Sequence, residues 1–261
     1  MNQILETLYA LRTIHGDFSE RDVSDGDLQT VVDACVRAAN SSARQPYSII
    51  VVKDRCVVKE QFAYGGSKAL LFCVDFNRIV ASAEHVGRKY AVNGIIDFIT
   101  CSTDTILAAQ TAAIAAKSLG IDSMFTNSIH RRDISGLYDY FGLPRRYCFP
   151  LIALLLGYPA KEPAYLKGRF TGSGLVHDGR YRMPDAAGLD ELVRQYDDPG
   201  RHLGLIGDWG RKGFSHYLEW FFDVWCGGEK TEKNDERNIE KHKEFYSVLQ
   251  QAGFIEPELI G

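Results

Sequence analysis

The sequence predicts a β-sheet flanked by α-helices, because short apolar runs typical of strands alternate with segments of helical periodicity. The composition agrees with a folded globular protein, since 45% of the 261 residues are hydrophobic and 25% are charged. A chain of this length forms one large domain, or one domain with an appendage. Lys and Arg together number 30 against 34 Asp and Glu, which argues against binding to nucleic acid or to an anionic membrane surface.

The first predicted helix follows Ser24, which with Asp27 three residues later resembles a capping box. Apolar side chains at helical spacing follow it at Leu28, Val31, Val32, Cys35, Ala38 and Ala39. Four apolar or β-rich runs then predict core strands at residues 47–52, 69–74, 123–126 and 148–156.

A long alanine-rich helix is expected between the second and third of these strands. We expect Ser102 or Thr103 to cap it and Gly120 to end it. Small side chains lie on several of its faces, so other backbone elements can approach closely, and the helix is predicted to be central or to lie at a subunit interface. Another amphipathic helix is predicted over residues 131–141, ended by Gly142 and Pro144.

The later part of the chain changes character. Residues 161–188 are rich in Gly, Pro and basic residues and predict an extended arm over a surface. Residues 189–261 are expected to be helical again, with a charged loop or helix start at 227–238. An aromatic cluster within them has helical spacing, which favours core or subunit packing over a ligand cage: Tyr217, Trp220, Phe221, Val224 and Trp225.

Several chemistries lack their sequence signature. The six cysteines include no C-x-x-C pair, so we expect reduced thiols without disulfides, metal or an iron–sulfur cluster. No G-x-G-x-x-G follows the first strand, no P-loop motif occurs, and the histidines are dispersed without metal-ligand spacing. Asp97, Asp104 and Asp122 remain unassigned, since their spacing gives no reason to choose them for acid–base work.

Neither export nor a membrane span is predicted. The N-terminal residues lack the basic start and unbroken apolar core of a signal peptide. The longest apolar run, FPLIALLLGY, is about half of the ~18 residues that a membrane span needs. We therefore expect a cytoplasmic protein.

Four segments together resemble the nitroreductase family of FMN-dependent oxidoreductases: LRTIH at 11–15, NSSARQPYSIIVV at 40–52, DSMFTNS at 122–128 and LLLGYPAKEPAYLKGR at 154–169. Their order and spacing carry the resemblance, which covers roughly the first two thirds of the chain. It implies an α+β sandwich, in which a mostly antiparallel central sheet is surrounded by helices, and an interlocked homodimer with active sites at its interface.

The resemblance also implies which residues bind FMN. Arg12, Thr13 and His15 match the family's opening phosphate motif, although Leu11 replaces a basic residue and His15 replaces Arg or Lys. In the second segment, the residues that correspond to the flavin-lining positions are Asn40, Ser41 and Gln45. Ala43 replaces the usual Asn and so loses a side-chain amide.

The remaining site predictions come from the third and fourth segments. Thr126, Asn127 and Ser128 form the turn whose backbone N–H groups face flavin N5 and O4 in relatives. Lys167 and Arg169 match the Lys-x-Arg that reaches the phosphate or the ribityl chain. Residues 78–100 are expected to form a lid or pocket wall with Tyr90 and Phe98 as substrate contacts.

The resemblance implies an FMN-dependent enzyme that passes a hydride from NAD(P)H through flavin N5 to an organic acceptor such as a nitroaromatic or a quinone. No catalytic side chain and no metal is expected, because the flavin carries the chemistry. Two alternatives stay open, namely a flavin-dependent reductive dehalogenase or specific metabolite oxidase, and a flavin-binding protein without turnover. We expect an FMN-binding core at 1–182 and a helical extension at 183–261.

Overall fold

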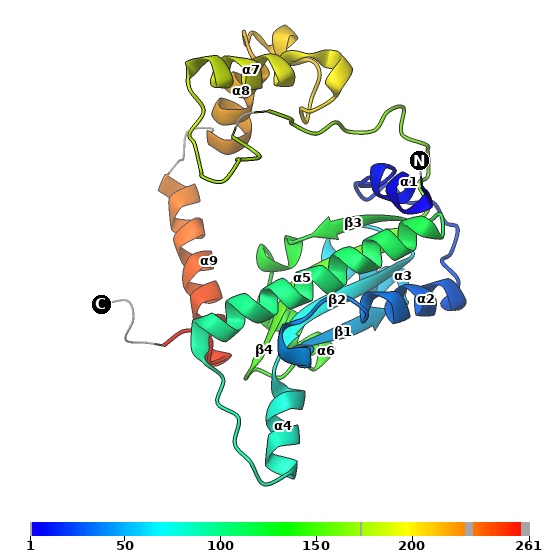
Figure 1. Cartoon of the computed structure of the whole chain (residues 1–261), viewed down its shortest axis with the longest axis vertical. Coiled ribbons are helices and arrows are strands. Elements are labelled where there is room, and N and C mark those ends of the chain that lie inside the picture. Colours follow the sequence, from blue (N-terminus) through cyan, green and yellow to red (C-terminus); the bar gives the residue numbers. More distant parts are fainter. Residues whose placement is uncertain (1, 173, 228–231, 257–261) are drawn as a thin grey trace. The chain divides into compact units, whose positions relative to one another are not determined.

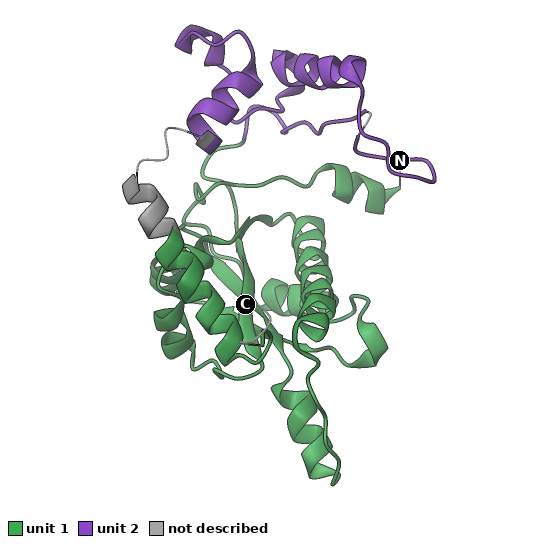
Figure 2. Cartoon of the chain, turned by 90° about the vertical axis from the view of Figure 1, so that its left-hand side faces the viewer, with its two compact units in different colours: residues 1–162, 239–261 green, residues 163–238 purple. Residues whose placement is uncertain are grey.

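The computed structural model describes residues 2–172, 174–227 and 232–256. It divides into two compact units, the first formed by residues 1–162 with 239–261 and the second by residues 163–238 (Figure 2). This division differs from the expected boundary at residue 182. The C-terminal residues return to the first unit because their apolar side chains, among them Val248, Leu249 and Phe254, are buried in its core.

A four-stranded antiparallel sheet forms the centre of the first unit. The strands are β1 (Tyr47–Val52), β2 (Lys68–Asp75), β3 (Asp122–Thr126) and β4 (Cys148–Gly157), in the order β1-β2-β4-β3. All four predicted strands are confirmed. The two middle strands are almost wholly buried, which explains why both are nearly continuous apolar runs.

One face of the sheet is covered by α2 (Asp25–Cys35) and α5 (Gly94–Ser118) (Figure 1). Ser24 caps α2 as predicted, because its Oγ accepts the N–H of Asp27 at 3.0 Å. The helix ends at Cys35, before Ala38 and Ala39. The alanines of α5 are buried against β2, β4 and α2, so the expectation of a closely packed central helix is confirmed.

The predicted start of α5 is wrong. The helix begins at Gly94, and both Ser102 and Thr103 lie inside it, where the Thr103 hydroxyl donates to the Ile99 carbonyl at 3.1 Å. Its N-cap, Asn93, makes no side-chain capping bond, so the true start carries no sequence signal. Gly120 follows the end of the helix with a left-handed φ of 74°, as expected.

The second core lies on the other face of the sheet, where α3 (Arg55–Phe62), α6 (Ile134–Phe141) and α9 (Glu232–Gln251) pack. Helix α6 begins three residues later than predicted, because the Asp133 carboxylate caps it by accepting the Gly136 N–H at 2.8 Å. Gly142 ends α6 in the left-handed conformation, as expected. Within the charged stretch 227–238, residues 228–231 lie outside the described part of the chain, and α9 begins at Glu232.

Two short helices complete the first unit, α1 (Gln3–Tyr9) and α4 (Asn77–His85). Helix α4 has no buried residue and extends away from the sheet (Figure 1). The segment 78–100 thus consists of most of α4, a connection at 86–93 and the first turns of α5.

The second unit begins with an irregular segment, since the described residues among 161–185 contain no helix or strand, in agreement with the predicted arm. It continues with α7 (Ala186–Asp197), the 3-10 turns η3 (Pro199–Arg201) and η4 (Trp209–Lys212), α8 (Tyr217–Trp220) and a π-helical stretch at Phe221–Gly227. Tyr217 stacks on Tyr196 with ring centroids 5.5 Å apart. Tyr217 and Trp220 are buried as packing residues, whereas Val224 and Trp225 are exposed.

Candidate cofactor site

The loop that leads from α2 into β1 is strained. It contains the short turn η1 (Ser41–Ala43), and three of its non-glycine residues have left-handed φ values: Ser42 at 56°, Ala43 at 53° and Gln45 at 47°. Each such residue costs about 1 kcal/mol or more, so the surroundings must hold the loop in place. Strain of this kind clusters at binding sites, and this is the loop to which the sequence assigns flavin contacts.

Hydrogen bonds from three other elements hold this loop. The Ser41 N–H donates to Asp104 Oδ2 on α5 at 2.9 Å. Arg78, in the first turn of α4, donates through Nη2 to the Arg44 carbonyl at 3.1 Å and to the Gln45 carbonyl at 2.5 Å. The Pro46 carbonyl accepts the N–H of Asp75 at the end of β2 at 3.0 Å.

The predicted flavin-lining side chains of the loop also have local partners. Gln45 Nε2 donates to the Val36 carbonyl at 3.1 Å, and the Gln45 N–H faces Asn40 Oδ1 at 3.4 Å. These bonds join the loop to the end of α2. The structure therefore brings Asn40, Ser41 and Gln45 together in one short segment at the end of the sheet.

Arg44 turns away from solvent toward the connection before α5. Its Nη1 donates to the Tyr90 hydroxyl at 2.6 Å and lies 3.5 Å from Asp97 Oδ1, while its Nε is buried and has no hydrogen-bond partner. Tyr90 stacks on Phe76 with centroids 6.2 Å apart. Arg44 thus joins the strained loop to the segment predicted as a lid.

The other predicted substrate contact, Phe98, lies among core rings. Its centroid is 4.9 Å from that of Phe254 and 5.5 Å from that of Phe149. Phe98 as a whole is half-buried.

The turn after β3 is fixed by a bond within the turn and by a bond to the end of α3. Thr126 Oγ1 accepts the Ser128 N–H at 3.0 Å, and Ser128 Oγ donates to the Phe62 carbonyl at 2.6 Å. Asn127 is exposed. The Ser128 N–H is therefore engaged within the turn and its hydroxyl at the end of α3, and Asn127 presents the accessible side chain.

Arg12 lies in an ion cluster at the start of β3. Its Nε and Nη2 donate hydrogen bonds to the Asp122 carboxylate at 2.6–3.1 Å, and its Nη1 lies 2.8 Å from the Glu162 carboxylate. Lys117 reaches the same Asp122 carboxylate at 2.6 Å. Burial acts to raise the pKa of Asp122, but hydrogen bonds from Arg12 and Lys117 outweigh it and hold that pKa below its usual value.

Thr13 and His15 follow Arg12 along an exposed segment. Thr13 forms a parallel bridge with Ser123 of β3, and the Ile14 N–H donates to the Ser123 carbonyl at 3.1 Å. His15 contacts the Tyr64 ring edge-on, with centroids 5.1 Å apart. The segment is therefore fixed beside β3 with both predicted side chains accessible to solvent.

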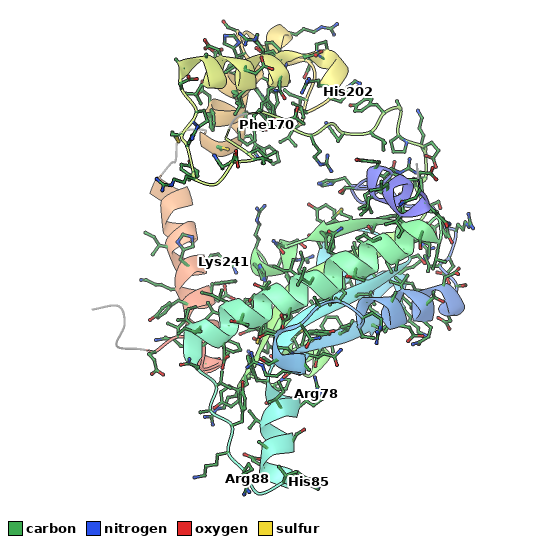
Figure 3. The ribbon with its side chains drawn as sticks, viewed as in Figure 1. Arg78, His85, Arg88, Phe170, His202 and Lys241 are labelled. Carbon is green, nitrogen blue, oxygen red and sulfur yellow. The ribbon has the colours of Figure 1, made fainter. Side chains whose placement is uncertain are left out.

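Lys167 and Arg169 belong to the second unit. Lys167 Nζ donates to the Gly204 carbonyl, and Arg169 Nη1 donates to the carbonyls of Lys167 and Gly168 at 3.1 and 2.9 Å. Lys167 also lines a cavity of about 720 Å³ in this unit. Tyr165 and His202, which is labelled in Figure 3, stack in that cavity with centroids 3.7 Å apart.

The described residues contain no group of three or more His, Cys, Asp or Glu that could hold a metal ion. The six cysteines are free; four are buried, while Cys56 and Cys226 are exposed. Within the described ranges, no helix is long and apolar enough to cross a membrane.

Known enzymes resemble this chain over much of its length. It is 29% identical over 209 residues to the oxygen-insensitive NADPH nitroreductase of Salmonella typhimurium, which covers 76% of this chain and 81% of that enzyme. It is 28% identical over 208 residues to the NAD(P)H FMN reductase of Bacillus subtilis, with the same two coverages of 76% and 81%. Its curated homologues are thus enzymes named nitroreductase and FMN reductase. No protein-family model matches it.

Solved structures establish the nitroreductase fold. A protein from Bacteroides fragilis superimposes with a TM-score of 0.79 at 21% identity, over 96% of this chain and 100% of that one. A nitroreductase from B. subtilis superimposes with a TM-score of 0.71 at 22% identity, over 92% of this chain and 98% of that one. The predicted α+β class with an antiparallel sheet is therefore confirmed.

Sequence reasoning missed two residues that fix the strained loop, Asp104 and Arg78. Asp104 was noted but not assigned, although a carboxylate within an alanine-rich, apolar helix was a signal that it has a specific partner. Arg78 lies on an exposed helix, and its sequence neighbours give no sign that it reaches the carbonyls of residues 44 and 45.

Proposed function

We propose that the protein is an FMN-dependent oxidoreductase that passes a hydride from NAD(P)H, through N5 of the flavin, to an organic acceptor such as a nitroaromatic or a quinone. The observation that carries this proposal is the similarity, over 76% of the chain, to enzymes named NADPH nitroreductase and FMN reductase. The strained loop at residues 41–45 supports it, because the resemblance assigns flavin contacts to that loop and strained backbone clusters at binding sites.

The donors present fit FMN in their chemistry. Arg12 is shared between two carboxylates, but they hold it unequally, because the Asp122 side chain is 2% exposed and that of Glu162 is 72% exposed. An exposed ion pair contributes little, so the Nη1 edge that faces Glu162 can exchange this partner for a phosphate. His15, Lys167 and Arg169 are the further cations that we assign to the phosphate or the ribityl chain.

FMN, when bound, supplies the atom that accepts and donates the hydride. The protein's residues are assigned to binding and orientation. Asn40, Ser41 and Gln45 are proposed to line the ring system. The turn at residues 126–128 is proposed to face it with backbone N–H groups other than that of Ser128, which donates to Thr126 Oγ1. Tyr90 and Phe98 are proposed to contact the substrate. Such a site acts by holding the reacting atoms at roughly 3–3.5 Å rather than by an acid or a base.

We propose a homodimer as the active assembly. Large apolar side chains line the outer face of α5 and are 41–61% exposed: Ile95, Ile96, Ile99, Ile106 and Leu107. Exposed apolar side chains gathered on one helix favour an interaction site, and a second copy offers a matching set. Sedimentation is expected to detect no monomer at micromolar concentration; a folded, flavin-loaded monomer would contradict the proposal. A cytoplasmic location belongs to the same proposal and is supported by the free cysteines.

The deciding experiment is an anaerobic titration of purified protein. We expect a yellow protein whose flavin absorbance is bleached by NADH or NADPH and recovers when an acceptor is added. Flavin colour that persists with both nicotinamides would refute the oxidoreductase and favour a flavin-binding protein without turnover. Bleaching without recovery by nitroaromatics or quinones would favour the dehalogenase or metabolite oxidase.

A further inference from the structure

Asp104 is a buried carboxylate whose position needs an explanation. Its residue is 4% exposed, and it lies on α5 among buried alanines. Among the described residues, no lysine, arginine or histidine forms an ion pair with it. A buried charge is costly unless strong hydrogen bonds stabilise it. Its partner is the backbone N–H of Ser41, at 2.9 Å, where the strained loop begins.

Arg78 acts on the other end of the same loop. Its guanidinium donates to the carbonyls of Arg44 and Gln45. These are the peptide carbonyls before and after the Cα of Gln45, the last residue of the loop with a left-handed φ. In Figure 3, Arg78 lies at the end of α4 that is nearest the sheet. Charged donors and acceptors make the stronger hydrogen bonds, so an anion holds one end of the loop and a cation holds the other.

We infer that Asp104 and Arg78 are positioning residues, which together hold Ser42, Ala43 and Gln45 in their left-handed conformation and thereby present Ser41 and Gln45 to the flavin. This inference rests on the proposed function. Without the two side chains, Ser42, Ala43 and Gln45 are expected to relax toward negative φ, because that region is favourable for L-residues. The peptide groups of the loop would then rotate, and the flavin-lining side chains would be displaced.

The inference predicts a specific pattern of binding. The loop is assigned to the flavin ring system, which FMN and riboflavin share. Losing the side chain of Asp104 or of Arg78 should therefore weaken the binding of FMN and of riboflavin by the same factor. A charge-assisted hydrogen bond corresponds to about tenfold or more in affinity. We therefore expect Asp104→Ala and Arg78→Ala each to raise both dissociation constants about tenfold. Asp104→Asn keeps an acceptor for the Ser41 N–H and should stay within about threefold of wild type.

Glycine substitutions in the loop distinguish two roles for Asp104, namely holding the loop conformation and stabilising helix α5 itself. Glycine adopts positive φ without the Cβ penalty, so Ser42→Gly with Ala43→Gly should lower the strain that Asp104 offsets. In the Asp104→Ala background, this pair is expected to restore flavin affinity by about threefold or more. The same pair in an otherwise wild-type chain should change affinity far less. Absence of rescue would overturn the positioning role.

The closing experiment measures the loop with and without flavin. Flavin fluorescence titration of the apoprotein gives both dissociation constants, and hydrogen exchange of the apoprotein gives the protection of residues 40–46. We expect Asp104→Ala and Arg78→Ala to raise exchange in this loop while α2 and β2 stay protected. Unchanged exchange, or unchanged affinity for both flavins, would overturn the inference. A wild-type protein that binds no flavin, but whose loop loses protection in the variants, would instead refute the proposed function and leave the anchoring intact.

Discussion

Asp122→Ala removes the carboxylate at the centre of the ion cluster that ties the N-terminal segment to β3. Asp122 is 2% exposed and is held by both Arg12 and Lys117, whose side chains are 19% and 16% exposed. Removing one partner of a buried pair costs about 3–5 kcal/mol. Both cations here keep access to water, so we expect about 3 kcal/mol, the low end of that range.

The measurement is the thermal midpoint of the wild type and of two variants. In a chain of this size, about 3 kcal/mol corresponds to a fall of roughly 6–12 °C at pH 7. Asp122→Asn, the matched control, keeps the shape and an acceptor but loses the charge, so a smaller fall is expected. Because the folded pKa of Asp122 lies below its ordinary value of 3.8, its stabilisation is present above that value and is lost as pH falls through the folded pKa.

Two results would refute this reasoning. Equal midpoints for the wild type and Asp122→Ala at pH 7 would mean that the cluster is screened by solvent and contributes nothing. A difference between the wild type and Asp122→Asn that persists undiminished well below pH 3.8 would mean that shape, and not charge, accounts for the loss.

Three further predictions concern separate parts of the chain. Arg169→Ala is expected to weaken the binding of FMN about 10- to 100-fold and to leave the binding of riboflavin, which lacks the phosphate, unchanged. Equal losses of affinity for both ligands would mean that Arg169 does not bind the phosphate. Burial lowers the pKa of His130 in the folded protein. The stability of the fold that depends on neutral His130 is therefore complete above the ordinary pKa of 6.5, and it is lost as pH falls from 6.5 through the folded pKa. Thermal midpoints of the wild type should decline over that window, and those of His130→Phe should decline less. Gly157→Ala places a Cβ 2.7 Å from the Phe18 ring and should cost about 1–3 kcal/mol in thermal unfolding, whereas Gly207→Ala, which has open space around it, should cost little.

The strands could be predicted from the sequence because the sheet is buried. The two middle strands, β2 and β4, are nearly continuous apolar runs with clear ends. The outer strands β1 and β3 are shorter and carry apolar or β-branched residues beside polar ones. The start of α5 could not be predicted, since its N-cap makes no capping bond and none of residues 95–99, which are three isoleucines, Asp97 and Phe98, is buried. The return of residues 239–261 to the first unit depends on long-range packing of Phe254 against Phe76 and Phe98, which local periodicity does not encode.

The resemblance points to residues of the candidate site, but the sequence does not predict the conformation of the loop that holds them. The order of the motifs pointed to Asn40, Ser41 and Gln45, and the structure places them in one segment. Left-handed backbone is usually recognised by glycine or asparagine, and residues 41–45 contain neither. The conformation is imposed instead by bonds to Asp104 and Arg78, which lie 63 and 33 positions along the chain from Ser41 and Gln45.

Ala43 connects these observations. The resemblance to the nitroreductases places asparagine at this position, and asparagine tolerates left-handed φ better than alanine does. At a φ of 53°, Ala43 therefore lacks both the amide and that conformational tolerance. The bonds that Asp104 and Arg78 make to the loop must offset the additional strain. A chain with Ala43→Asn should accordingly depend less on Asp104, so that Asp104→Ala weakens flavin binding by a smaller factor in that background than in the wild type.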